Sequence, residues 1–249
     1  MRAPPETSQI CYTGKIRGRS MKKKVTALIL CGGKGDRLRP LTDSLPKPLV
    51  LLGGRPILSY VMNHLKRYGI DDVVIAAGYQ KEKIHEFFEE NHCGLNVKIM
   101  DTGNVDIIER IKSCSSQISD DFIVLYGDTI ADVNLEQLQA FHLSHSLKAT
   151  MTLWPLRTSF GLAELDGEGN VLQFREKPVL DHWINIGYFY YEKEILSWIK
   201  DFSTYAAFLE FLANQKELKG FKHHGLHITV NSLRELEDAE KNIHEFEFK

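Results

Sequence analysis

Short apolar runs alternate with amphipathic stretches through the first half of the chain. Continuous apolar runs of strand length predict buried strands at 25–30, 73–78, 96–100 and 122–128. Between them, apolar residues recur at helical spacing, which predicts helices from Arg55 to a C-cap at Gly69, at 81–90, at 107–114 and from an N-cap at Asn134 to 145. Buried strands separated by amphipathic helices are typical of a parallel sheet with helices on both faces.

The pattern changes after residue 148. Apolar runs at 149–154, 161–165, 171–174 and 184–191 predict antiparallel or mixed strands, with the turn DGEGN between the second and the third. Helices are expected at 192–200, 205–216 and 232–244. We therefore predict one α/β domain over residues 21–249, with a small antiparallel layer that covers the substrate. Residues 1–20 are polar and without periodicity, which predicts a disordered leader.

Composition narrows the class of protein. Of the 249 residues 43% are hydrophobic and 26% charged, as in soluble globular proteins, and the net charge of -2 argues against nucleic acid or a membrane surface as partner. No apolar run approaches the roughly 18 residues that span a bilayer. The four cysteines (Cys11, Cys31, Cys93 and Cys114) show no CxxC spacing, which indicates reduced thiols in a cytoplasmic protein.

The stretch LCGGKGDRLRPLTDSLPKPLV, from Leu30 to Val50, follows the first predicted strand. It matches neither the P-loop nor the dinucleotide pattern G-x-G-x-x-G, and the absence of the latter argues against a dehydrogenase. Ligands of an open parallel sheet bind beyond the carboxyl ends of its strands, and glycines there let backbone N–H groups approach a phosphate. Arg37 and Lys47 can add positive charge, and the prolines beside Lys47 restrain its direction. The stretch predicts a phosphate site.

Three later segments carry weaker signals. Asp128 closes YGD at the end of the fourth predicted strand, so it shares the ligand edge and, with phosphate oxygens, can hold Mg²⁺. Glu176 and Lys177 in REKP can bind sugar hydroxyls and a phosphate, or form an exposed salt bridge. HHGLH at 223–227 has no recognised zinc spacing, and we interpret it as the solvated start of a strand.

Taken in order, CGGKGDRLRPLTDSLPKPLV, YGD, REKP and INIGYFYY strongly resemble the motifs of the sugar-1-phosphate nucleotidyltransferases, over about residues 22–240. The resemblance implies a Rossmann-like mixed, mostly parallel sheet and an enzyme that joins an NTP and a sugar 1-phosphate and releases pyrophosphate. It implies a catalytic role for Arg37, Lys47 and Asp128. The residues implied to bind the nucleotide are Leu30, Gly32, Gly33, Gly35, Asp36, Arg37, Gly78, Asp101, Thr102 and Gly127. Those implied to bind the sugar and its phosphate are Gly161, Glu176, Lys177, Asn185 and Gly187.

Within the family, the layout is most similar to the glucose-1-phosphate cytidylyltransferases, which implies CTP and a role in polysaccharide precursor synthesis. The same reaction with GTP, dTTP or UTP, as in mannose- or heptose-1-phosphate guanylyltransferases, stays open. The resemblance also implies Mg²⁺ held by Asp128 and Asn231.

Two residues depart from the family pattern. Asn231 stands where the cytidylyltransferases have aspartate, and Asp36 where threonine or serine is usual, so a catalytically impaired, nucleotide-sugar-binding regulatory subunit is the alternative. Asp36 is otherwise expected to be the N-cap of the following turn. The C-terminal IHEFEF at 243–248 suggests packing against a neighbour in a homo-oligomer.

Overall fold

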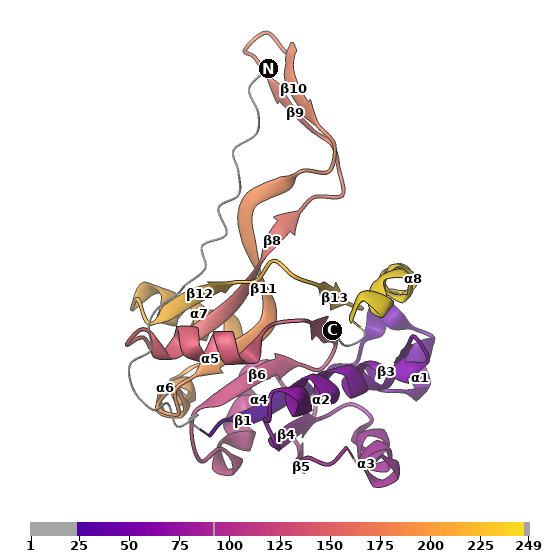
Figure 1. Ribbon diagram of the computed structural model, residues 1–249, viewed down its shortest axis with the longest axis vertical. Coiled ribbons are helices and arrows are strands. Elements are labelled where there is room, and N and C mark those ends of the chain that lie inside the picture. The colour runs from indigo at the N-terminus through magenta and orange to yellow at the C-terminus, as the bar shows by residue number, and fades with distance from the viewer. Residues whose placement is uncertain (1–23, 92, 247–249) are drawn as a thin grey trace.

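The computed structural model describes residues 24–91 and 93–246, and its centre is a seven-stranded sheet with helices on both faces (Figure 1). The strand order is β12-β8-β11-β6-β1-β4-β5. Their bounds are β1 Thr26–Cys31, β4 Asp72–Ala77, β5 Asn96–Asp101, β6 Phe122–Tyr126, β8 Ala149–Arg157, β11 Val179–Tyr191 and β12 Leu218–Lys222. In this sheet, β11 is antiparallel to both neighbours and the other pairs are parallel. The predicted mixed, mostly parallel α/β fold is confirmed.

The connections around β1 create a crevice at one edge of the sheet. From β1 the chain moves to β4 and β5 on one side, and it returns to pair β6 on the other side of β1. In open α/β sheets, ligands bind at such a reversal, outside the carboxyl ends of the strands. Leu30 of β1 lies opposite Tyr126 of β6, so the glycine-rich stretch and the YGD segment leave the sheet side by side.

Alternation along the buried strands divides the core into two layers. Ala27 and Ile29 face a cluster that includes residues of α2 and α5, whereas Leu28 faces a cluster with residues of α4 and α7. The longer helices agree with the predictions to within a few residues at their ends. Their bounds are α2 Ile57–Arg67, α3 Lys81–Glu90, α4 Ile107–Cys114, α5 Leu135–Leu143, α7 Tyr205–Asn214 and α8 Leu233–Asn242. The helix expected at 192–200 is only α6 (Ile195–Trp198), continued by a 3-10 turn.

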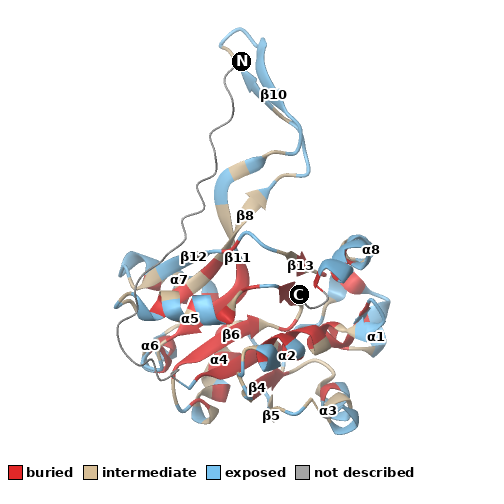
Figure 2. Ribbon diagram, viewed as in Figure 1, coloured by how far each residue is buried: buried red, intermediate tan, exposed pale blue. Residues whose placement is uncertain are grey.

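In the second half the predicted antiparallel strands are present, but two of them join the main sheet instead of forming a small layer of their own. The predicted strands at 149–154 and 184–191 are parts of β8 and β11, which extend the main sheet. The reason is burial on both faces: the four successive residues from Tyr188 to Tyr191 in β11 carry large aromatic side chains that are buried on either side of the sheet. What remains outside the main sheet is the predicted hairpin of β9 (Leu162–Leu165) and β10 (Val171–Arg175), which stands away from the body (Figure 1) and is largely exposed (Figure 2).

The remaining elements are short. Their bounds are α1 Leu41–Ser44, β2 Leu51–Leu52, β3 Arg55–Pro56, β7 Thr129–Ala131 and β13 His227–Thr229. None of the described helices is long and apolar enough to cross a membrane.

The ends of the chain bear on two predictions. The leader at 1–20 lies outside the described residues, and a single domain over 21–249 stays a prediction. The suggestion that IHEFEF packs against a neighbour is wrong for its described part, because Ile243 and Phe246 are buried against this chain's own Tyr60 and α8.

Candidate active site

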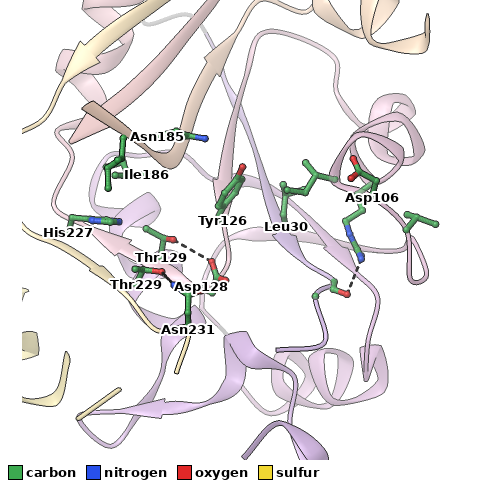
Figure 3. Close-up of a pocket in the computed structure, with 16 residues that line it drawn as sticks. Leu30, Asp106, Tyr126, Asp128, Thr129, Asn185, Ile186, His227, Thr229 and Asn231 are labelled. Carbon is green, nitrogen blue, oxygen red and sulfur yellow. Dashed lines mark hydrogen bonds between the residues drawn. The ribbon is translucent and has the colours of Figure 1, made fainter. Parts of the chain in front are cut away.

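A cavity of about 590 Å³ lies at the carboxyl ends of β1 and β6 (Figure 3). Its volume suits a small-molecule ligand, and its position is the crevice that the strand order creates. The lining residues are Leu30, Gly32, Gly33, Val105, Asp106, Ile107, Arg110, Tyr126, Asp128, Thr129, Ile184, Asn185, Ile186, His227, Thr229 and Asn231. Six of these were implied by the sequence: Leu30, Gly32, Gly33, Asp128, Asn185 and Asn231.

Lys47 joins two oxygen-bearing side chains at the edge of this cavity. Its ammonium donates to the carboxylate of Asp128 and, over 2.8 Å, to the side-chain oxygen Oδ1 of Asn231. Lys47 is only 8% exposed. Because water screens a buried charge poorly, this ion pair holds its members together more firmly than a surface pair does.

The short strands β7 and β13 explain how residues so distant in the sequence meet. Asp128 immediately precedes β7, and Asn231 follows the end of β13. The two strands pair antiparallel with Thr129 opposite Thr229, so the start of one lies beside the end of the other. The amide nitrogen Nδ2 of Asn231 donates to Oγ1 of Thr229 over 3.0 Å, which fixes the direction of the side-chain oxygen.

The same pairing corrects the interpretation of HHGLH as a solvated strand start. β13 does begin at His227, but the segment is not solvated throughout. His223 is buried with its Nε2 3.0 Å from Asp132, and His227 lines the cavity. The cause is the contact of this segment with β7 and with Leu153 in the middle of β8.

Asp128 and Asn231 fit a magnesium ion that arrives with a nucleotide. Both present a hard oxygen, the ligand type that Mg²⁺ prefers, and both oxygens converge on one ammonium. Among the described residues there is no group of three or more histidine, cysteine or acidic side chains able to hold a metal by themselves. The remaining ligands would therefore be phosphate oxygens and water, as is usual for Mg²⁺.

Arg110 on α4 holds two loops together. One terminal nitrogen of its guanidinium donates to Oγ1 of Thr102 over 3.1 Å and to the carbonyl of Gly103 over 3.0 Å. The other donates to the carbonyl of Gly32 over 2.9 Å. Arg110 is 4% exposed, and this burial lowers its pKa, although arginine remains charged in proteins. The glycine-rich loop after β1 is thus tied to the loop after β5.

Two glycines are required by this arrangement. A Cβ atom at Gly32 would lie 1.3 Å from a terminal nitrogen of Arg110, and one at Gly78 would lie 2.5 Å from the same atom. Any larger residue would displace the guanidinium from its acceptors. At Gly33, by contrast, a Cβ would meet nothing within 4 Å. Its main chain is open to the cavity, where its lack of a side chain allows close approach of a ligand.

Asn185 and Gly187 shape the opposite wall. The backbone N–H of Gly187 donates to the side chain of Asn185 over 2.8 Å, where the register of β11 against β8 shifts. Gly187 has φ 78°, and a Cβ there would lie 2.4 Å from the ring of Tyr126. The glycine therefore allows β11 to bend over Tyr126, and Figure 3 shows that ring between Leu30 on one side and Asn185 on the other.

The fixed charges of the cavity nearly cancel. Burial lowers the pKa of His227 to about 4, and burial raises the pKa of Tyr126 to about 12, so both are neutral at pH 7. The charged residues of the lining are Asp106, Arg110 and Asp128, and Lys47 lies against Asp128. A triphosphate would bring several negative charges that these side chains alone do not balance, which favours a metal ion as partner.

Gly35, Asp36 and Arg37 lie in the loop after β1 but not in the cavity lining. The side chain of Arg37 is exposed. The N-cap expected at Asp36 is wrong: Gly35 holds that position with φ 68°, and Asp36 is the first residue of the turn. Its carboxylate instead lies 3.0 Å from the guanidinium of Arg39, which partly neutralises a negative charge near the predicted triphosphate site.

The other implied nucleotide residues surround the cavity rather than line it. Thr102 donates to the carbonyl of Ala77 over 2.8 Å and accepts from Arg110. The N–H of Gly127 donates to the carbonyl of Leu30 over 3.1 Å, which ties the ends of β1 and β6. Asp101 is exposed and pairs with Lys81.

Three of the implied sugar-binding residues lie outside the cavity. Gly161, Glu176 and Lys177 belong to the foot of the β9–β10 hairpin, and the last two have side chains 65% exposed. A Cβ at Gly161 would lie 2.4 Å from the ring of Phe174 and 2.9 Å from the carboxylate of Glu176, so these residues are neighbours. Their role in sugar binding stays a prediction.

Sequence reasoning missed Arg110, Tyr126, Thr129 and His227. For Arg110 a signal existed, because it lies on the face that Ile107, Ile111 and Cys114 give the helix, and a charge within an apolar stripe indicates a specific partner. His227 carried no comparable signal, since only the pairing of β13 with β7 brings it to the cavity.

The chain is similar to known nucleotidyltransferases. Residues 26–216 match the family model described as nucleotidyl transferase. The glucose-1-phosphate cytidylyltransferase of Salmonella typhi is 32% identical over 237 residues, which cover 84% of this chain and 92% of that protein. The bifunctional protein GlmU of Methanocaldococcus jannaschii is 28% identical over 227 residues, covering 87% of this chain but 54% of that protein.

Solved structures share the fold. HddC of Yersinia pseudotuberculosis, crystallised with GMP-PN, has a TM-score of 0.67 at 21% identity, covering 88% of this chain and 99% of that one. A Bacillus anthracis protein crystallised with sucrose has a TM-score of 0.74 at 20% identity, covering 90% and 97%. The family model, which matches more than half of the chain, and the Salmonella typhi relative at 32% identity show the family: the chain belongs to the nucleotidyl transferase family, among the sugar-1-phosphate nucleotidyltransferases.

Proposed function

We propose that the protein joins CTP and a sugar 1-phosphate in an Mg²⁺-dependent reaction, giving a CDP-sugar and pyrophosphate. The observation that carries the proposal is the contact of Lys47 with both Asp128 and Asn231 at the edge of the cavity. It brings a buried cation and two oxygen ligands to one place, where a triphosphate can be bound.

In the proposed reaction, an oxygen of the sugar phosphate attacks the α-phosphorus of CTP. The new bond joins that oxygen to the α-phosphorus, and the bond from the α-phosphorus to the oxygen of the leaving pyrophosphate breaks. No covalent enzyme intermediate is needed, so the protein contributes positioning and charge. Mg²⁺, when bound, would supply charge neutralisation between the phosphates.

We assign each part of this positioning and charge stabilisation to particular residues of the chain. Leu30 and the glycines at 32, 33 and 35 would receive the nucleotide along the main chain, with Arg37 on the triphosphate. Lys47 would stabilise the α-phosphoryl group under attack, and Asp128 with Asn231 would hold the metal ion. Asn185 and Gly187, on the wall formed by β11, would hold the sugar phosphate, together with Gly161, Glu176 and Lys177 if the foot of the hairpin approaches the cavity.

CTP is proposed over the other nucleotides because a relative at 32% identity, matched over 92% of its length, is a glucose-1-phosphate cytidylyltransferase. The reaction with UTP, dTTP or GTP is the runner-up. The setting we propose is precursor synthesis for polysaccharides in the cytoplasm.

A catalytically impaired regulatory subunit is the second candidate. The observation in its favour is Asn231, a neutral ligand that binds Mg²⁺ less strongly than a carboxylate does. The ion pair of Asp36 with Arg39 weakens the other argument for it, because Arg39, which also pairs with Asp43, partly compensates the negative charge of Asp36.

The test is pyrophosphate release from CTP, UTP, dTTP, GTP and ATP, each with a panel of sugar 1-phosphates and Mg²⁺, with product masses as readout. We expect turnover with CTP and its loss on addition of EDTA. Turnover with another nucleotide only would contradict the choice of CTP. Nucleotide binding in calorimetry without turnover for any pair would contradict catalysis and favour the regulatory subunit.

A further inference from the structure

A second cavity, of about 560 Å³, is formed by α6 and its 3-10 continuation (Ile199–Asp201), by α7, and by the turn that leads into β12. Its volume falls within the range of small-molecule sites. The residues that line it are Ser197, Trp198, Asp201, Phe202, Phe211, Gln215 and Glu217. None of them lines the first cavity, at the ends of β1 and β6, and the proposed nucleotidyl transfer uses none of these side chains.

Three aromatic rings line the second cavity. Trp198 and Phe211 meet edge to face with their ring centroids 6.3 Å apart, and the centroid of Phe202 lies 5.0 Å from that of Phe211. All three side chains are half-buried, so part of each remains accessible from the cavity. Phe202 also packs on Phe208, which is fully buried, with centroids 5.3 Å apart. The rings are therefore anchored in the core while they present a surface to the cavity.

The polar part of this lining is negative. Asp201 and Glu217 contribute two carboxylates, and among the described lining residues there is no lysine, arginine or histidine. One oxygen of Glu217 accepts the backbone N–H of Lys148 over 3.1 Å, which orients the carboxylate without neutralising it. Gln215 is the C-cap of α7, so the negative end of that helix dipole lies at the cavity too. A phosphate or nucleotide would be repelled here.

Aromatic rings next to carboxylates are the groups that recognise an organic cation. The face of an aromatic ring carries partial negative charge, and a cation within about 6 Å of the ring centroid is attracted to it. Quaternary ammonium groups are bound in this way by aromatic side chains. A neutral ligand would stack on the rings but would leave both carboxylates without a partner of opposite charge. The charge of the lining therefore favours a cation.

The wall of the second cavity is hydrogen-bonded to both ends of α4. The ammonium of Lys112, in the last turn of α4, donates to the carbonyl of Phe202 over 2.7 Å. The N–H of Tyr205 donates over 3.1 Å to the carboxylate of Asp106, which is the N-cap of α4 and lines the first cavity. The same helix carries Arg110, whose guanidinium ties the loops after β1 and β5. Residues 202–205 thus connect the two cavities through α4.

We propose that the second cavity is an effector site for a small organic cation with a quaternary ammonium group, and that its occupancy acts on the first cavity through α4. A ligand against Phe202 restrains the segment that holds α4. Less ordering of the loops held by Arg110 then remains when a nucleotide binds, so the nucleotide should bind more tightly. This second part rests on the proposed function, whereas binding of the cation does not.

Calorimetric titration of the full-length chain with choline, at constant ionic strength and without nucleotide, tests the site. The control ligand is 3,3-dimethylbutan-1-ol, which has the shape of choline but a carbon atom in place of the charged nitrogen. We expect choline to bind at least about tenfold more tightly than this neutral molecule, because the rings and carboxylates attract only the charge. Equal affinities, or no binding of choline, would overturn the proposal.

Variants place the binding in this cavity. Asp201→Asn combined with Glu217→Gln keeps the shape of both side chains, and Trp198→Ala removes one ring; each should weaken choline binding at least about tenfold. Trp183→Ala is the matched control, because Trp183 is also half-buried but lines neither cavity, and binding should be unchanged. Equal losses in the control and in the double variant would contradict the site. Thermal unfolding checks each fold, and the double variant decides if Trp198→Ala does not fold.

The connection through α4 is tested by nucleotide affinity. We expect saturating choline to tighten binding of the nucleotide that turns over at least about fivefold in the unchanged chain. Lys112→Met leaves the cavity lining intact but removes the hydrogen bond to Phe202, so it should bind choline normally and lose the effect on nucleotide. No effect in the unchanged chain, or the same effect in Lys112→Met, would overturn the connection. Pyrophosphate release tests the proposed function separately, so the two failures are distinguishable.

Discussion

The cavity and the arm, as we call residues 158–178 with the β9–β10 hairpin, both contain residues that the sequence implied for ligand binding, but their surroundings are opposite. At the cavity, Lys47 and Arg110 are 8% and 4% exposed, and each is fixed by hydrogen bonds from more than one loop. On the arm, Glu176 and Lys177 have side chains 65% exposed and lie 4.0 Å apart as a loose ion pair. The comparison teaches that this chain fixes the side chains of its cavity through its own packing, whereas it leaves the arm largely uncovered.

The largest expected effect is the loss of turnover when a charged side chain at the cavity is replaced. Lys47→Ala and Asp128→Asn should each lower turnover at least about 1,000-fold, because each removes fixed charge at the reacting phosphates. Pyrophosphate release at saturating nucleotide measures this. Lys83→Ala is the control, since it removes an exposed ammonium that pairs with Glu86 and does not line the cavity, so it should leave turnover unchanged. Unchanged rates in both Lys47→Ala and Asp128→Asn would refute the assigned roles.

The second prediction compares the loss of stability when a phenylalanine is replaced in each of the two regions. Phe189 on β11 is 0% exposed, so Phe189→Ala should lower the free energy of unfolding by about 3–5 kcal/mol. Phe174 on the arm is 62% exposed, so Phe174→Ala should change it by less than about 0.5 kcal/mol. Urea unfolding followed by fluorescence measures both. Equal losses would mean that the arm packs on its own chain.

The smallest expected effect is a difference in stability between alanine substitutions at two adjacent glycines of the cavity. Gly32→Ala should lower the free energy of unfolding by about 1–3 kcal/mol, because its Cβ displaces Arg110 and leaves buried acceptors unpaired. Gly33→Ala should change it by less than about 0.5 kcal/mol, since its Cβ meets open space. Equal losses in the unliganded protein would show that Arg110 does not hold the loop as described.

Much of the cavity follows from local sequence. The apolar runs are buried strands, the Gly-rich stretch leaves the end of β1, and Asp128 leaves the end of β6, because parallel strands bring their carboxyl ends to one edge. The sequence also predicts that the main chain at Gly32 and Gly33 is approached closely. It does not predict that the two glycines are needed for different reasons, since the guanidinium that packs against Gly32 comes from α4, far along the chain.

What the sequence by itself determined is therefore the class of fold, the family motif and the end of the sheet at which ligands bind, since these depend on period, strand order and local turn chemistry. Tertiary structure alone decided three further things. The pairing of β7 with β13 brings Asn231, which the family resemblance had implied only as a metal ligand, into contact with Lys47 beside Asp128. The hydrogen bonds of Arg110 tie the loops after β1 and β5. The exposure of the arm is the third, and it follows from the position of the hairpin beyond β8 and β11. Alternation along a strand predicts which side chains share a face, but it does not predict whether another element covers that face.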